Sequence, residues 1–286
     1  MPFLVLAGVL WGTGGLLGSL LAERTGLSAL AVAGYRLAGG GLVLVALLAL
    51  SGRRPRGPAA WRRIAAIGAL AAVFQAAYFT AVSLTSVSLA TLVTIGSAPV
   101  VVLLVERAGG WAMVGTVGLA VLGIVLLVGL PGGGLDPASA LLGSALAVVA
   151  GSGFAAMTLL AARPVPGLDA ALTTGPAFLL GGSALLVPLA AVDPSAVAFV
   201  PEPGALVLLV AFAVLPTAAA YTCYFRGLAA STASVGAVTA LLEPLTAAVL
   251  AAVVLGERLG AAGTVGAALV GAAVVLAGRQ ERERSA

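Results

Sequence analysis

The chain has 286 residues, of which 61% are hydrophobic and only 8% are charged, with a mean hydropathy of +1.19. A soluble domain carries about 25% charged residues, so this chain has too few to cover a water-facing surface. The absence of His excludes HExxH zinc sites and Ser-His-Asp catalysis, and we expect neither a metal nor a cofactor. The basic residues are all Arg and cluster at the ends of apolar segments, which argues against nucleic-acid binding.

Apolar segments recur along the whole chain. A bilayer core of ~30 Å needs about 20 apolar helical residues per crossing. We therefore predict an all-α, polytopic membrane protein with ten transmembrane helices. They are expected at about residues 3–22, 29–50, 63–82, 87–105, 111–130, 138–162, 170–191, 204–226, 231–254 and 261–278. The first segment has no basic region before it, so we expect a retained helix rather than a signal peptide.

The distribution of Arg predicts the orientation. If the N-terminus is cytoplasmic, only Arg24 and Arg258 lie outside and Arg36 lies within a span. The other arginines then lie on the cytoplasmic side, as the positive-inside rule requires: Arg53, Arg54, Arg56, Arg62, Arg63, Arg107, Arg163, Arg226, Arg279, Arg282 and Arg284. We expect a multi-pass protein of the plasma or inner membrane, with both termini and a tail at 280–286 in the cytoplasm.

The two halves of the sequence resemble each other. The matches, in order, are Gly12-Thr13-Gly14 with Gly151-Ser152-Gly153, Arg24 with Arg163, Pro99 with Pro244, and Gly115-Thr116-Val117-Gly118 with Gly263-Thr264-Val265-Gly266. This pattern predicts two five-helix repeats, at residues 1–131 and 138–279. Because each copy has an odd number of spans, the second copy is inverted. Inverted repeats are typical of secondary transporters, although a duplication could also serve only to build a stable bundle.

Several of these motifs resemble the EamA-type family of drug/metabolite transporters. They are Trp11-Gly12, Arg36, Leu242-Glu243-Pro244 and Leu255-Gly256-Glu257-Arg258-Leu259. The resemblance covers nearly the whole chain and implies ten helices around a central cavity, with transport of small metabolites, often outward. The first repeat departs from the pattern, since Glu106 follows Pro99 more closely than Glu257 follows Pro244. The fourth helix, or its junction with the fifth, therefore differs in length.

Two ionisable residues lie inside predicted spans, Arg36 and Glu243. A charge at the centre of a span costs about 2.5–3.5 kcal/mol on insertion scales, so each needs a partner, water or a function. At a rise of about 1.5 Å per residue, both reach a similar depth. We expect both to face one cavity, where Glu243 binds an amine or a coupling proton and Arg36 pairs with it or binds a carboxylate. A fixed ion pair, or an Arg36 that snorkels to the outer face, is the alternative.

Three further side chains are cavity candidates: Trp11, Gln75 and Tyr78. Each has a structural alternative: Gln75 could form a hydrogen bond within the bundle, and the two aromatic residues could be anchors at the membrane interface. For Tyr221, near the predicted inner end of its span, we expect an anchor. GxxxG spacing at Gly8 and Gly12 favours close helix packing inside the bundle. The alternative is that the same glycines form the contact of a homodimer.

Prolines inside spans predict helix kinks. Pro99 and Pro244 each remove the hydrogen bond to a carbonyl one turn earlier. At Pro244 we expect the kink to aim the carboxylate of Glu243. At Pro216 we expect an ordinary kink, with the freed carbonyl of Phe212 satisfied by a neighbouring hydroxyl.

The leading hypothesis is a secondary transporter that moves a small organic metabolite by alternating access, most simply an exporter. One alternative is a membrane-embedded enzyme that acts on a lipid-linked substrate. Another is a non-transporting receptor or assembly subunit. An enzyme would need clustered acids or metal ligands at one interface, and the sequence offers only Glu106, Glu257 and scattered acids in loops. We therefore expect no enzymatic activity.

Overall fold

The computed structural model describes residues 1–106, 110–129, 136–254 and 260–285, and within these ranges it is helical with no strands. Its elements are α1 (Pro2–Gly12), α2 (Gly14–Thr25), α3 (Ala29–Leu50), α4 (Gly57–Leu84), α5 (Val87–Glu106), α6 (Trp111–Val128), α7 (Pro137–Ala161), α8 (Ala170–Val192), η1 (Pro194–Val197), α9 (Pro203–Ala213), η2 (Val214–Ala219), α10 (Ala220–Leu228), α11 (Ala233–Ala240), α12 (Leu242–Val254) and α13 (Ala261–Ser285). In this described part, ten helical stretches are long and apolar enough to cross a membrane. The predicted all-α class and its ten spans are confirmed.

Polar side chains at helix starts explain several of the boundaries. Ser28, Asp136, Asp169 and Thr232 each accept a hydrogen bond from a backbone N–H in the first turn of the helix that follows. At Asp136, these bonds from the α7 N-terminus hold the pKa of the carboxyl below its ordinary value. Among the described residues, two boundaries differ from the prediction by more than three residues. Helix α4 begins six residues earlier, at Gly57, and α13 continues to Ser285, so most of the predicted tail is helical.

Three spans are not continuous α-helices. The first breaks at Thr13, whose hydroxyl bonds to the carbonyl of Leu10 at 2.7 Å. The ninth breaks at Leu241, two residues before Glu243. The eighth contains a six-residue π-helical segment, η2, that includes Pro216. Broken helices at membrane depth are tolerated where they line a cavity or are buried in protein, so these interruptions direct attention to the centre of the bundle.

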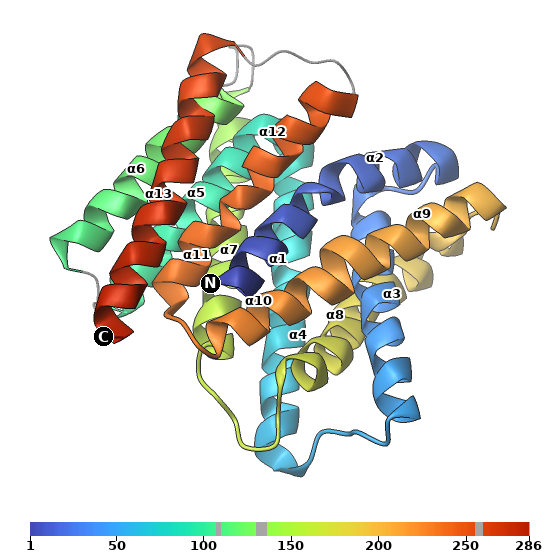
Figure 1. Ribbon diagram of the computed structural model, residues 1–286. Helices are drawn as coiled ribbons and strands as arrows, with labels where there is room; N and C mark the ends of the chain where they lie inside the picture. The colour runs from blue at the N-terminus through green and yellow to red at the C-terminus, as the bar shows by residue number, and fades with distance from the viewer. Residues whose placement is uncertain (107–109, 130–135, 255–259, 286) are drawn as a thin grey trace.

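Helices from the two halves of the chain pack against each other. Helix α3 lies along α8, and α6 lies along α13 (Figure 1). Helices α4 and α7 form another extensive contact, as do α1 and α10. Glycines permit the closest crossings: a Cβ on Gly41 of α3 would collide with the backbone nitrogen of Leu179, and one on Gly182 with that of Ala38. The bundle is thus held together by contacts between the halves.

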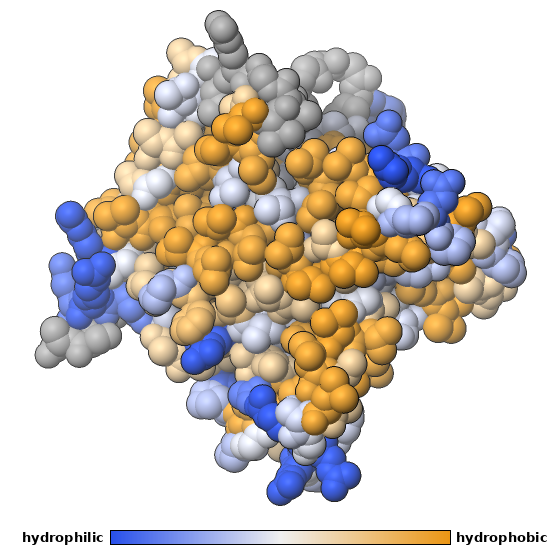
Figure 2. Space-filling model, turned by 45° about the vertical axis from the view of Figure 1, so that its right-hand side comes forward, coloured by the Kyte–Doolittle hydropathy of each residue, from blue (hydrophilic) through white to orange (hydrophobic). Residues whose placement is uncertain are grey.

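Gly8 and Gly12 also lie at such a crossing. A Cβ on Gly8 would collide with Leu242, and one on Gly12 with Thr246, both residues of α12. The GxxxG spacing in the first span therefore serves packing within the bundle. Figure 2 shows the outer surface, where hydrophobic side chains cover most of the visible face and hydrophilic ones gather toward its edges. Such a belt suits lipid tails.

One end of the bundle collects many of the arginines. There Arg63, at the start of α4, reaches the end of α7, and Arg53 pairs with Asp169 at the start of α8. Both chain termini lie near this end, because Arg226, at the same end, stacks over the ring of Phe3, and a Cβ on Gly278 in the last helix would touch the side chain of Met1. The opposite end carries the turns between α2 and α3 and between α4 and α5.

Candidate functional site

A cavity of about 370 Å³ lies in the centre of the bundle. Helices of both halves line it: α2, α3, α4 and α5 from the first, and α7, α9, α10, α11 and α12 from the second. Its lining reaches Ala22 and Ala29, which flank the turn between α2 and α3, and Val82 and Val87, which flank the turn between α4 and α5. The cavity therefore extends toward the end of the bundle that lies opposite the arginine-rich end.

Arg36 and Glu243 both line this cavity. Arg36 lies on α3, and Glu243 lies in the first turn of α12, directly after the break at Leu241. The two charges interact electrostatically, but no direct ion pair joins these two described residues. The guanidinium of Arg36 lies over the ring of Phe212, 5.3 Å from its centre, and its Nε is buried without an acceptor among the described residues. Both residues thus retain binding capacity.

Gln75 and Tyr78 also line the cavity, one helical turn apart on α4. Gln75 is only 2% exposed, and within the described part of the chain its side-chain nitrogen has no hydrogen-bond partner. The hydroxyl of Tyr78 shares a hydrogen bond of 2.8 Å with that of Thr91 on α5. A buried amide without a partner is costly, and a bound acceptor would satisfy it.

Trp11 takes a different position from the other candidates. It is buried and does not belong to the cavity lining. Its ring packs 4.8 Å from that of Tyr221 and 5.8 Å from that of Phe154, and both of those residues do line the cavity. Trp11 therefore lies behind the cavity wall and supports it.

Six aromatic side chains form a cluster that we call the aromatic layer. Its members are Trp11, Phe154, Phe178, Tyr221, Tyr224 and Phe225. The expectation that Tyr221 is an interfacial anchor was wrong: it is 3% exposed, lines the cavity and packs 4.5 Å from Phe178. Depth counted along a helix could not reveal this, because the neighbouring rings come from other spans. The layer reaches from the cavity to Phe225, which lines a second pocket.

The prolines have distinct surroundings. Pro99 lies inside α5, whereas Pro244 follows the break between α11 and α12. Pro216 lies in η2, and the hydroxyl of Thr217 donates to the carbonyl of Phe212. The expected neighbouring hydroxyl is thus present at Pro216.

The acids available for other chemistry are few and separated. In the part of the chain that the structure describes, no group of three or more His, Cys, Asp or Glu side chains could hold a metal ion. Glu106 instead caps α11, since its carboxylate accepts hydrogen bonds of 3.0 Å from the backbone nitrogens of Ala233 and Ser234. The motif at 255–259, with Glu257 and Arg258, lies outside the described residues, as do Arg107 and residue 131.

The geometry defines a polytopic membrane protein with a charged cavity at its centre. The sequence matches the EamA-like transporter family over residues 1–129 and again over 141–279. The chain therefore belongs to this family and is a membrane transporter. It is 28% identical over 276 residues to the "Uncharacterized transporter YwfM" of Bacillus subtilis (strain 168). This match covers 94% of this chain and 90% of that protein. A solved crystal structure shares the fold with a TM-score of 0.79 at 20% identity, covering 98% of this chain and 97% of the other.

Proposed function

We propose that the protein is a secondary transporter that moves a small organic metabolite by alternating access through the central cavity. The observation that carries this proposal is the cavity itself, in which each half of the chain contributes one charge, Arg36 and Glu243. Its volume lies within the range of about 300–1,000 Å³ that is usual for small-molecule sites. The aromatic layer would close the path on the arginine-rich side, while the cavity, which extends toward the other end, would be open to that side.

Alternating access would follow from a duplicated architecture. We propose that residues 1–131 and 138–279 are inverted repeats, which exchange conformations around the central site. The helix contacts support this: α3 against α8 and α6 against α13 pair equivalent spans, and the contact of α4 with α7 has its counterpart in that of α10 with α1. The contacts of α5 with α7 and of α12 with α1 correspond in the same way.

The lining of the cavity suggests the substrate class. An acid and an arginine face a mostly apolar space with aromatic walls, including Phe74 and Phe154. A metabolite with an amine for Glu243, an anionic acceptor for Arg36 and Gln75, and an apolar body would complement these groups. Glu243 could alternatively carry a coupling proton, because it is the acid in the described cavity lining.

The orientation and direction complete the proposal. The arginine-rich end, with both termini, would face the cytoplasm of the plasma or inner membrane, in line with the positive-inside rule. Transport would be outward, as the family resemblance implies. We propose that the substrate crosses without chemical change.

Flux from proteoliposomes tests the function. Vesicles loaded with amino acids, nucleosides, sugars or quaternary amines should release one class along an imposed solute or proton gradient. The substitution Glu243→Gln should reduce this flux more than tenfold, whereas Glu202→Gln, the same change at an exposed acid outside the cavity, should not. If every class stays inside the vesicles, the transport proposal fails. If Glu243→Gln and Arg36→Gln both keep full flux, the site assignment fails.

A further inference from the structure

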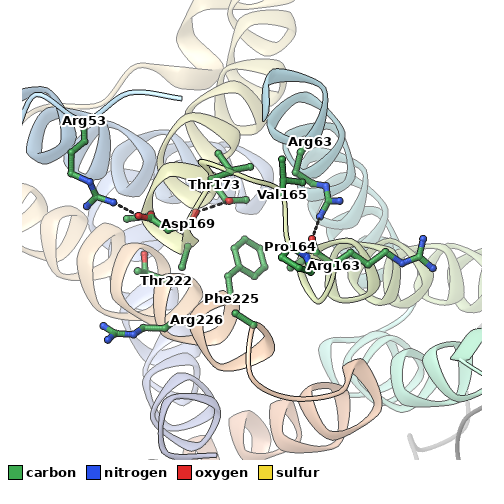
Figure 3. Close-up of a pocket in the computed structure, with 15 residues that line it drawn as sticks. Arg53, Arg63, Arg163, Pro164, Val165, Asp169, Thr173, Thr222, Phe225 and Arg226 are labelled. Atoms are coloured by element: carbon green, nitrogen blue, oxygen red, sulfur yellow. Dashed lines mark hydrogen bonds and ion pairs between the residues drawn. The ribbon is translucent and has the colours of Figure 1, made fainter. Parts of the chain in front are cut away.

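A second pocket, of about 420 Å³, lies at the arginine-rich end of the bundle. It is formed by the start of α4, the connection from α7 to α8 and the end of α10. Figure 3 shows the ring of Phe225 at its centre, and this ring belongs to the aromatic layer. The pocket and the central cavity are therefore adjacent to the same aromatic cluster, one toward each end of the protein.

The lining of the second pocket carries an excess of positive charge. It includes four arginines and one acid, Asp169, which is already paired with Arg53. Arg163 and Arg226 lie at the rim and extend away from the pocket centre (Figure 3), and Arg226 stacks over the ring of Phe3. Arg63 is thus the cation that is held against the pocket wall.

The guanidinium of Arg63 is fixed but not neutralised. Its Nη1 donates to the backbone carbonyls of Leu160 and Arg163, the second at 2.8 Å. Its Nε and Nη2 have no acceptor among the residues that the structure describes. The nearby positive charge of Arg163 repels that of Arg63. A guanidinium with a fixed orientation, free donors and a like charge beside it is a favourable place for a carboxylate or phosphate.

A second donor lies on the other side of the Phe225 ring in Figure 3, at Thr222. The Oγ1 of Thr222 is buried, has no partner in the described part of the chain, and belongs to a residue that lines the pocket. Between the two donors, Phe225 and Val165 supply apolar surface. The pocket therefore offers a cation at one end, a hydroxyl donor at the other end, and an apolar wall between them.

We propose that this pocket binds a small organic anion, with its carboxylate or phosphate group held by Arg63, its apolar body against Phe225, and Thr222 donating a hydrogen bond to a polar atom at its other end. Its placement next to the aromatic layer makes it the vestibule from which such an anion enters the transport path. That role as vestibule rests on the proposed transport function, whereas the binding itself does not.

Calorimetry on the purified full chain in a nonionic detergent tests the binding, with 4-hydroxybenzoate as the probe, because its phenolic oxygen can accept from Thr222, and 4-hydroxybenzamide as its uncharged isostere. The probe 4-hydroxybenzoate should bind the wild type and 4-hydroxybenzamide should not. Affinity for 4-hydroxybenzoate should fall about tenfold or more in Arg63→Gln and severalfold in Thr222→Val. Arg62→Gln is the matched control, because it removes an exposed charge next to Arg63 that lies outside the lining. Arg63→Lys, which keeps the charge, should bind better than Arg63→Gln.

Thr222→Val removes only a hydroxyl, so it tests the site even if Arg63→Gln does not fold. Binding of 4-hydroxybenzoate that is equal in the wild type, Thr222→Val and Arg63→Lys, or that weakens as much in Arg62→Gln as in either site variant, would overturn the proposal. Thermal stabilisation of the protein by phosphatidylglycerol vesicles, with no binding of 4-hydroxybenzoate or inorganic phosphate, would overturn it in favour of a lipid headgroup. Glu243→Gln should retain binding of 4-hydroxybenzoate while losing flux, which separates this site from the proposed transport site.

Discussion

The hydroxyl of Thr217 donates a hydrogen bond of 3.0 Å to the carbonyl oxygen of Phe212, five residues earlier in the chain. Pro216 has no N–H and cannot serve that carbonyl. Thr217 is fully buried and Phe212 is 4% exposed, so water cannot replace the missing donor. The π-helical segment η2 thus interrupts the eighth span, and the carbonyl of Phe212 beside the cavity stays hydrogen bonded.

We predict that Thr217→Val lowers the free energy of unfolding by about 1–2 kcal/mol, because it leaves the buried carbonyl of Phe212 without a donor. Thr217→Ser keeps the hydroxyl and should lose less. Thermal denaturation in detergent measures both. The control is Thr264→Val, where the hydroxyl bonds to Gly260 at the exposed start of α13. If Thr217→Val and Thr264→Val have the same stability, the hydroxyl of Thr217 does not stabilise the π-helical segment.

Glu106 links two spans by capping α11, and its removal should loosen the start of that helix. We predict that Glu106→Gln destabilises the protein by about 1–2 kcal/mol, since a carboxylate at a helix N-terminus binds both the free N–H groups and the helix dipole. Hydrogen exchange at Ala233 and Ser234 should accelerate. Glu23→Gln, at an exposed acid, is the control. Unchanged exchange at the two amides would contradict the capping role.

Asp169 has two structural roles and Arg53 has one, so their substitutions should lower the melting temperature by different amounts. Asp169 pairs with Arg53 and also accepts a hydrogen bond of 3.0 Å from the backbone nitrogen of Leu172, which caps α8. Half-exposed ion pairs contribute about 0–1 kcal/mol, whereas a cap contributes about 0.5–2 kcal/mol. We predict that Asp169→Ala lowers the melting temperature more than Arg53→Ala does. Equal shifts would show that the cap contributes nothing.

The crossing of α3 and α8 requires glycine at Gly41. A methyl group there would press on the backbone of Leu179, which cannot move without separating the helices. We predict that Gly41→Ala destabilises the protein by about 1–3 kcal/mol through overpacking. Gly118→Ala is the control, because a Cβ at that exposed position in α6 meets nothing within 4 Å. There the better helix propensity of Ala should leave the melting temperature unchanged or slightly higher. A Gly41→Ala protein as stable as wild type would contradict the close packing.

Much of the fold could be predicted because it depends on local properties. The length of each apolar run and the Arg, Pro and Gly residues between runs located most of the span boundaries to within three residues, with the start of α4 and the end of α13 as the exceptions. The sequence could not locate the break at Thr13, because Thr is compatible with a helix and the adjacent Gly12 packs against Thr246, which is far away in the chain. It also gave no signal for the cap that Glu106 forms on α11, since the two residues that it binds are more than a hundred positions away.

The candidate site, like the fold, could be predicted from the sequence only in part. Counting residues along each helix placed Arg36 and Glu243 at similar depths, and the structure places both on the lining of one cavity. Their role in transport stays a proposal. The same counting assigned Tyr221 to the interface, because depth along one helix says nothing about the direction in which a side chain points.

By itself, the sequence determined that the chain spans a membrane ten times, since apolar length and charge placement follow from residues close together in the chain. Only the tertiary structure decided where the cavity lies, which rings form the aromatic layer and that Arg63 and Thr222 share a pocket. These features arise where distant helices meet, and that meeting depends on how small residues and side-chain shapes fit across the two halves of the bundle.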